Sequence, residues 1–167
     1  QRWHGELSRA DVVSDFAGDW GLKDPVALLM STEHLSSSAL CLLNDSSEVC
    51  TGFEYSVPEG LNLTAQLREL ALANLSTSLP NQIRLVGLVN GDMQLSGHLD
   101  DLDGNANLAA DEWSGTFESP NGTESIGFSN SRISALLNEG KLELSTSGQI
   151  ADAGELTGSL TMPLVPG

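Results

Sequence analysis

The sequence predicts an all-β fold of antiparallel strands, with at most a short helix near residues 70–79. Three observations support this fold class. Apolar and polar residues alternate over long stretches, turn-forming residues separate these stretches, and only 5% of the residues are aromatic in a chain rich in Ser, Thr, Asn and Gly. Spacing alone is compatible with a sandwich, a barrel or an open curved sheet.

The longest alternating stretch is Ile83–Leu99, where every odd position is apolar or glycine. Its centre holds Asn90-Gly91, a dipeptide typical of two-residue hairpin turns. A two-residue turn there would pair Val89 with Asp92 and join the apolar face of one strand to the polar face of the next. We therefore predict one long strand, bent or bulged near its glycines, although a three-residue loop would also preserve the alternation.

The remaining elements follow from the same alternation and from turn signals. The helix within 70–79 would end before Pro80. Turns are expected at 58–60, at Asp103-Gly104, and at 120–122, 138–140 and 153–154, because these segments combine Gly with Pro, Asn or Asp, or place Ala before Gly. In chain order, the other alternating stretches are 26–30, 61–68, 106–110, 133–137, 141–150 and 155–162.

Glycine repeatedly occupies the apolar face, at Gly87, Gly91, Gly97, Gly148 and Gly158. A tightly filled sandwich would favour Val or Ile at such positions. Glycine removes a side chain and permits sharp bending, which suits a sheet curled around an apolar trough. Ordinary bulges within a filled sandwich are the alternative interpretation.

The two cysteines flank a turn-rich segment, residues 44–47. A hairpin centred on this segment pairs Cys41 with Cys50 and Leu42 with Val49, and it places the cysteines on the more polar face. We predict a disulfide between Cys41 and Cys50, formed in an oxidising compartment. Two inert thiols are the alternative.

The chain carries 23 acidic residues against 7 Lys and Arg, a formal net charge of −16. Nucleic-acid binding is excluded as a function class because it requires a basic surface, and docking on anionic lipid headgroups is disfavoured for the same reason. The acids also suit a solvated β-rich surface with protected edges.

No pattern in the sequence indicates an enzyme, a cofactor or a metal site. His4, His34 and His98 lie far apart without a ligand at close spacing. No serine has the G-x-S-x-G context of a nucleophile. The acidic segment 100–105 lacks the spacing and the distal Glu of a calcium loop, so we interpret it as a solvated turn.

The chain begins with Gln and contains no signal peptide or membrane span. We therefore expect it to be a fragment whose targeting information lies elsewhere.

Several motifs, weak individually, follow one another in an order that resembles the TamB family, large relatives of AsmA in the envelope of Gram-negative bacteria. The likeness covers most of the chain and thins to generic strands after Phe117. The motifs are the opening Trp3-His4-Gly5-Glu6-Leu7, then Asp19-Trp20-Gly21-Leu22 with Pro25, the paired-cysteine hairpin, the stretch 70–80 ending in Leu-Pro, and 83–91, which matches L-x-L-x-G-x-L-x-G.

The resemblance, to part of the family's C-terminal TamB domain, implies a β-taco, a long curved antiparallel sheet folded into an open apolar groove. Residues 1–167 would form a single β-taco segment of a larger periplasm-spanning protein, anchored in the inner membrane of a Gram-negative bacterium. The implied partner is a TamA-like outer-membrane barrel. The implied cargo is phospholipid acyl chains or unfolded outer-membrane proteins such as autotransporters, and no enzyme activity or cofactor is implied.

The alternating pattern indicates which side chains would line such a groove. For each of them, a place in an ordinary hydrophobic core is the alternative, as in an adhesin-like or structural β-sandwich. The predicted lining residues are Leu61, Leu63, Leu67, Ile83, Leu85, Val89, Met93, Leu95, Leu99, Leu108, Leu142, Leu144, Ile150, Leu156, Leu160 and Met162.

Overall fold

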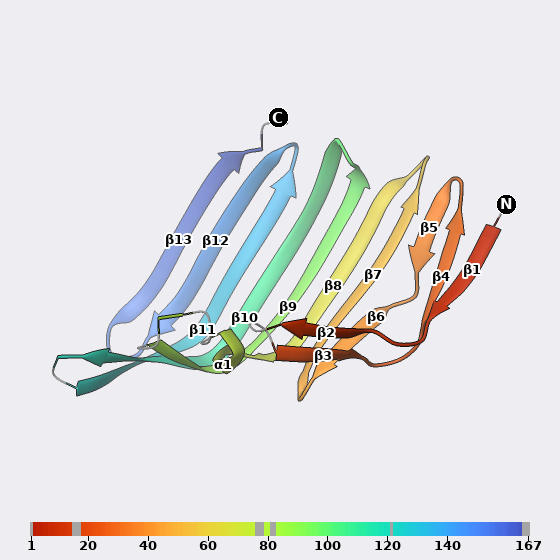
Figure 1. Cartoon of the computed structure of the whole chain (residues 1–167). Coiled ribbons are helices and arrows are strands. Elements are labelled where there is room, and N and C mark those ends of the chain that lie inside the picture. The colour runs from red at the N-terminus through yellow and green to blue at the C-terminus, as the bar shows by residue number, and fades with distance from the viewer. Residues whose placement is uncertain (1, 15–17, 76–78, 81–82, 121, 165–167) are drawn as a thin grey trace.

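The computed structural model describes residues 2–14, 18–75, 79–80, 83–120 and 122–164. Over these residues the chain forms one open antiparallel sheet of 13 strands and one short helix, α1 (Leu72–Leu75). Figure 1 shows that the sheet curves without closing into a barrel. The all-β fold and the short helix are therefore confirmed, although 76–78 of the predicted helical stretch lie outside the described residues.

The strands follow one another along the sheet from β7 to β13, so neighbours in sequence are neighbours in space. Their bounds are β1 (Arg2–Leu7), β2 (Asp11–Ser14), β3 (Gly18–Leu22), β4 (Val26–Ser31), β5 (His34–Ser37), β6 (Leu40–Asn44), β7 (Ser47–Ser56), β8 (Gly60–Ala71), β9 (Ile83–His98), β10 (Asp101–Ser119), β11 (Gly122–Asn138), β12 (Lys141–Ile150) and β13 (Gly154–Pro163).

The long alternating stretch is a single strand, β9, and its odd positions are more buried than its even ones throughout. Asn90-Gly91 lies in mid-strand, so neither a two-residue nor a three-residue loop interrupts it. The prediction of a turn at Asp103-Gly104 was wrong, because both residues belong to β10 and the reversal occurs at 99–100. Leu99 is accordingly a turn residue, 72% exposed, and does not continue the apolar face.

The sheet divides into two branches at β7. The first half of β7 pairs with β6, which leads to β3 and β2, and the second half pairs with β5, which leads to β4 and β1. Figure 1 shows β2 and β3 lying across the lower ends of the long strands. Val26, at the start of β4, is fully buried. This fork creates two walls, a tall one that includes β5, β4 and β1 and a short one that includes β6, β3 and β2.

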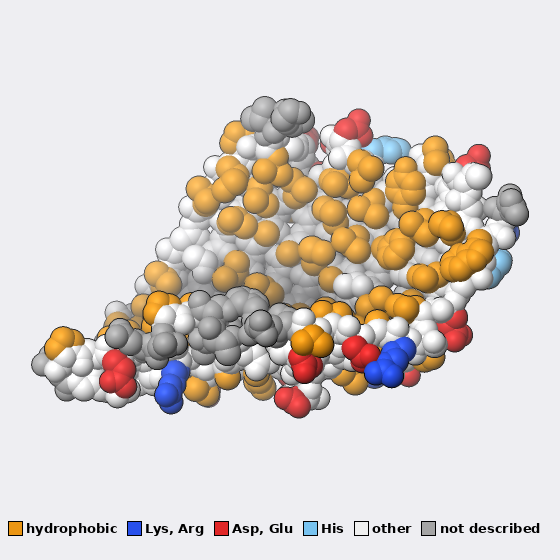
Figure 2. All heavy atoms as spheres, in the orientation of Figure 1, with side chains coloured by type: hydrophobic (Ala, Val, Ile, Leu, Met, Phe, Trp, Pro, Cys, Tyr) orange, Lys and Arg blue, Asp and Glu red, His pale blue; other side chains and the backbone are white. Residues whose placement is uncertain are grey.

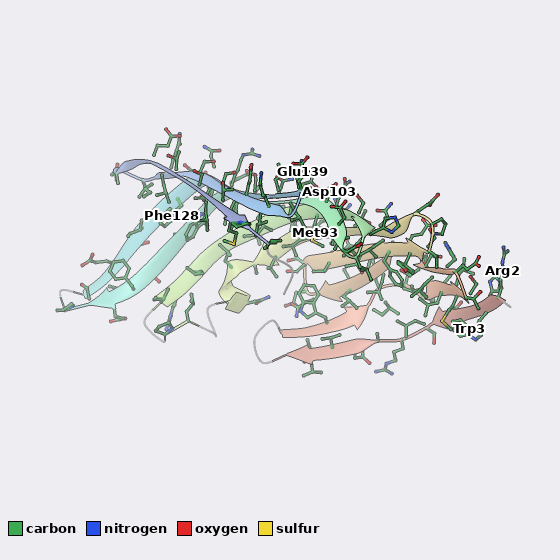
Figure 3. The ribbon with its side chains drawn as sticks, turned by 90° about the horizontal axis from the view of Figure 1, so that it is seen from above. Arg2, Trp3, Met93, Asp103, Phe128 and Glu139 are labelled. Carbon is green, nitrogen blue, oxygen red and sulfur yellow. A yellow bond between two sulfur atoms is a disulfide. The ribbon has the colours of Figure 1, made fainter. Side chains whose placement is uncertain are left out.

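The long strands bend along one line, which we call the crease. Three strands each contain one extra residue relative to a neighbouring strand. These bulges lie in β8 relative to β9, between Leu67 and Leu70; in β10 relative to β9, between Ala109 and Trp113; and in β11 relative to β12, between Ser129 and Arg132. Such bulges bend a strand and increase its twist. Seen from above, in Figure 3, the lower ends of β10 and β11 turn out of the tall wall, and Phe128 lies on this lower part.

A filled core is absent from the described part of the chain. Its buried apolar side chains are Trp20, Val26, Leu72 and Ala110. A sandwich of two packed sheets would bury a continuous layer of inward-facing residues. The filled-core alternative is therefore wrong.

Glycines on the apolar face allow β9 and β10 to approach each other closely. A Cβ added at Gly91 would lie 2.5 Å from Leu108 Cδ2, and one at Gly87 would lie 2.5 Å from Trp113 Cβ. Gly87 also has a φ of 144°, which L side chains rarely adopt. These glycines therefore allow close approach of the two strands, and the space above them is taken by the neighbouring strand.

Replacing Gly87 by alanine should lower the free energy of unfolding by about 1–3 kcal/mol, because a strained backbone conformation of this kind has such a cost. Gly115→Ala is the matched control, since its Cβ would contact only Leu85 Cδ2, at 3.6 Å. Urea unfolding followed by circular dichroism measures both variants. Equal losses would contradict the special role of Gly87.

Candidate binding groove

Apolar side chains form rows across the concave face of the sheet, one residue from each strand in register. Such rows arise because every second side chain of a strand points to the same face. Figure 2 shows these side chains gathered over the hollow of the molecule. Three of the rows from β7 to β13 are Phe53-Leu63-Leu95-Gly104-Leu137-Leu142-Met162, Thr51-Ala65-Met93-Ala106-Ala135-Leu144-Leu160 and Val49-Leu67-Gly91-Leu108-Ile133-Thr146-Gly158.

The predicted groove residues lie on this face, with the exception of Leu99. Several large apolar side chains here remain solvent-accessible: Leu108 is 41% exposed, Ile133 50% and Leu160 52%. The three rows contain no charged residue. By strand, the predicted residues are Leu61, Leu63 and Leu67 on β8; Ile83, Leu85, Val89, Met93 and Leu95 on β9; Leu108 on β10; Leu142, Leu144 and Ile150 on β12; and Leu156, Leu160 and Met162 on β13.

Some lining residues beyond the crease do not follow from a single unbroken alternation. Leu70 and Trp113 face the groove although they break the spacing set by Leu67 and Leu108, because an extra residue in β8 and in β10 reverses which positions point inward. The signal was present, since apolar residues change from odd to even positions in β8 and from even to odd positions in β10. Phe53 and Ile133 were also missed, although both continue alternating stretches.

The crease forms an apolar cavity of about 300 Å³ that is partly open to solvent, which we call the crease cavity. Its walls come from β8, β9, β10 and β11, and Leu72 of α1 contributes one side. Trp113 Nε1 donates a hydrogen bond to Ser131 Oγ at 2.8 Å. The Trp113 ring stacks on Phe128 with centroids 4.0 Å apart and planes 7° from parallel. The position of Trp113 in the wall is therefore determined by two contacts.

The opposite, convex face is mostly polar. One row across it is Cys50-Gln66-Asp92-Asn107-Ser134-Ser145-Ser159. A hollow of about 750 Å³ on this side is lined by residues of both charge signs, including Glu48, Arg68, Asp92 and Arg132. Exposed apolar residues such as Val86 and Leu136 interrupt the polar face without forming rows.

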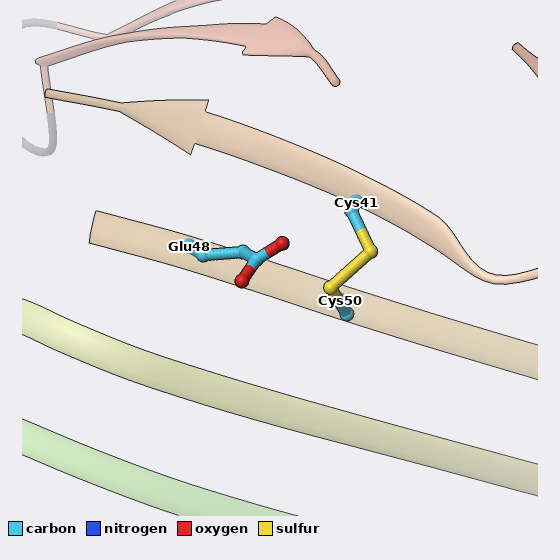
Figure 4. A group of neighbouring side chains, drawn as sticks. All are labelled: Cys41, Glu48 and Cys50. Atoms are coloured by element: carbon cyan, nitrogen blue, oxygen red, sulfur yellow. A yellow bond between two sulfur atoms is a disulfide. The ribbon is translucent and has the colours of Figure 1, made fainter. Parts of the chain in front are cut away.

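Cys41 and Cys50 form the predicted disulfide between β6 and β7, with Cα atoms 4.0 Å apart. Figure 4 shows Glu48 beside this bond. Although the three side chains are close enough to share a metal ion, both sulfurs are used by the disulfide and are not available as thiolate ligands. We therefore interpret this group as a structural connection at the fork.

Glu48 connects the branch that contains β6 and β3 to the long strands electrostatically. Lys23 Nζ donates to Glu48 Oε1 at 2.7 Å, and Arg68 Nη1 donates to Oε2 at 3.4 Å. The hydrogen bond from Lys23 lowers the pKa of the Glu48 carboxyl, desolvation opposes this shift, and the charges of Lys23 and Arg68 reinforce it. Lys23 follows β3 and Arg68 lies on β8, so the carboxylate joins three parts of the sheet.

Comparison with known proteins identifies a family. The family model described as "TamB, N-terminal domain" matches residues 1–166. This supports the resemblance noted in the sequence but corrects its placement in the C-terminal domain. No curated protein and no solved structure matches the chain. None of the helices in the described residues has the length and hydrophobicity needed to cross a membrane.

Removing the disulfide should lower the free energy of unfolding by roughly 2–3 kcal/mol, the loop-closure contribution of a short loop. The cysteines are nine residues apart. Urea unfolding with and without reductant measures this loss. The Cys41→Ala/Cys50→Ala double variant should match the reduced chain and should not respond to reductant. A response of that variant would contradict the assignment.

Glu48 should stabilise the fold more at neutral than at acidic pH. A carboxyl group whose pKa is lowered on folding contributes stability above its ordinary pKa of 4.5, and the contribution is lost as the pH falls through the folded value. We expect the loss of unfolding free energy in Glu48→Gln to be larger at pH 7 than at pH 3. Glu143→Gln on β12 is the control, and a loss independent of pH in Glu48→Gln would contradict the prediction.

Proposed function

Because the chain belongs to the TamB family, we propose that its concave face carries the acyl chains of lipids across the cell envelope. Proteins of this family are components of the translocation and assembly module, which has a role in transport and assembly. On this proposal the chain is one β-taco segment of a longer periplasmic protein anchored in the inner membrane, and it has no enzymatic role.

The observation that carries the proposal is the set of uncharged, mainly apolar rows that cross seven strands with their side chains half-buried or exposed. Each methylene group moved from water to such a surface contributes about 0.8 kcal/mol. Soluble proteins rarely leave a large contiguous apolar surface without a ligand or a partner. The headgroup would stay outside in water, because acids such as Asp103 and Glu139 lie at the ends of β10 and β11 (Figure 3).

A second candidate function is the assembly of outer-membrane proteins with a TamA-like barrel. It rests on β13, which pairs with β12 on one side and with no other described strand on the other. An unpaired edge offers backbone donors and acceptors to an incoming extended chain. This role would use the sheet edge and leave the concave face free.

A charge placed on the concave face should abolish lipid binding. Leu95→Arg introduces a guanidinium into the first apolar row, whereas Gln94→Arg introduces the same group at the adjacent position, which points to the convex face. Phospholipid extracted from each purified variant by organic solvent is quantified by mass spectrometry.

We expect Leu95→Arg to lose bound phospholipid by at least about tenfold, since a buried unpaired charge costs well over 1.4 kcal/mol. Gln94→Arg should retain it. Circular dichroism confirms that both variants are folded. Absence of lipid from the unsubstituted chain, or equal retention by both variants, would overturn the proposal.

A further inference from the structure

We propose that the crease cavity binds the methyl end of a single acyl chain, so that the groove contains a fixed binding pocket in addition to an open wall. This inference rests on the proposed function and names the part of the lipid that the crease recognises. It follows from how the cavity is formed, from its chemistry and from its size.

The register shifts bring two sets of side chains face to face. Leu67 and Leu108 belong to the tall wall, whereas Leu70 and Trp113 lie just beyond the extra residues, on the part of the sheet that turns away. All four line the crease cavity. Leu72 of α1, only 8% exposed, closes it from one side. The bend therefore produces a recess, still partly open to solvent, that a flat sheet would not have.

The chemistry of this cavity selects hydrocarbon. Its described lining is aliphatic or aromatic except for Ser131, whose hydroxyl oxygen accepts the hydrogen bond from the Trp113 indole. No lining residue among those described is charged. A headgroup or a peptide would have to bury polar atoms there without partners, which is unfavourable. An alkyl chain has no such atoms.

The size of the cavity sets how much of the chain enters. A water molecule takes up about 30 Å³ in the liquid, and a methylene group is of similar size, so the volume accommodates about ten methylene groups. A longer chain must continue outside. Leu108 and Ile133 both line the cavity and remain 41% and 50% exposed, so they connect it to the third apolar row. The ester end would therefore lie on the tall wall.

The orientation of the chain can be tested with Trp113 as an internal reporter. Trp3→Phe/Trp20→Phe leaves Trp113 as the single tryptophan of the chain. Phosphatidylcholine carrying a spin label near the methyl end should quench Trp113 fluorescence more strongly than the same lipid labelled near the ester. Equal quenching, or the reverse order, with lipid bound would overturn the inference while leaving the proposed function intact. If no lipid binds, both fail.

A second test changes the volume of the cavity. Ala110→Leu adds a bulky side chain to a lining residue, and Asn105→Leu adds the same side chain to the convex face of the same strand, away from the cavity. We expect Ala110→Leu to weaken binding of a ten-carbon phospholipid, whose acyl chain the cavity accommodates, about tenfold. Asn105→Leu should leave this binding unchanged. Unchanged binding by a folded Ala110→Leu variant would also overturn the inference, and if that variant does not fold, the quenching experiment alone decides.

Discussion

Cross-strand register is the constraint on which the groove depends. Side chains alternate between the faces of a strand, so an uncompensated slip of one residue would expose the apolar set of that strand on the convex face. β9 keeps one alternation over its whole length, and its neighbours adjust to it. In β8 the apolar positions move from Leu67 to Leu70 where one residue is inserted, and in β10 they move from Leu108 to Trp113. The bulges and the apolar pattern therefore change together, and the rows remain continuous across the crease.

The sequence predicts those parts of the fold that depend on local alternation and short-range pairing. β9 and the Cys41–Cys50 hairpin are of this kind, because each needs only the positions of a few neighbouring residues. The fork at β7 could not be predicted, because it depends on the pairing of β5 with the second half of β7, and β6 separates these two strands in the sequence. Turn propensity failed at Asp103-Gly104, where glycine is needed within β10 because a Cβ at Gly104 would lie 2.5 Å from the backbone carbonyl oxygen of Gln94 on β9.

The candidate site was predictable to the same extent. Alternation alone identified groove residues on β8, β9, β12 and β13. It did not identify Trp113, because the apolar positions of β10 change from even to odd before it, and a single unbroken alternation does not follow that change. Glycines such as Gly91 were interpreted as open room, whereas their surroundings show close approach of two backbones. The distance between two neighbouring strands depends on both of them, so it cannot be predicted from the sequence of one strand.

An open sheet without a filled core has to be stabilised and kept from associating by other means. Backbone hydrogen bonds between the long strands hold most of the sheet together. At the fork, where the strands are short, the disulfide and the Lys23–Glu48–Arg68 group add further connections. Exposed ion pairs contribute little individually, so the covalent bond is the stronger of the two connections. The net charge of −16 disfavours contact between copies at the sheet edges.

Lipid and polypeptide would use different surfaces of this molecule for a physical reason. Along the concave face, strands β7 to β12 are paired on both sides over most of their length, so most of their backbone groups are already hydrogen-bonded. An extended polypeptide lying in the groove would bury its own amides against side chains that offer no acceptors, at a cost of about 1–3 kcal/mol for each unpaired group. A hydrocarbon chain incurs no such cost. At the free edge of β13 the situation is reversed. The unpaired backbone groups there can form hydrogen bonds with an incoming strand, whereas an acyl chain has no group that could bond to them. Transport of lipid on the concave face and assistance to β-strand assembly at the edge of β13 are therefore compatible within one segment, because neither ligand has to leave before the other binds.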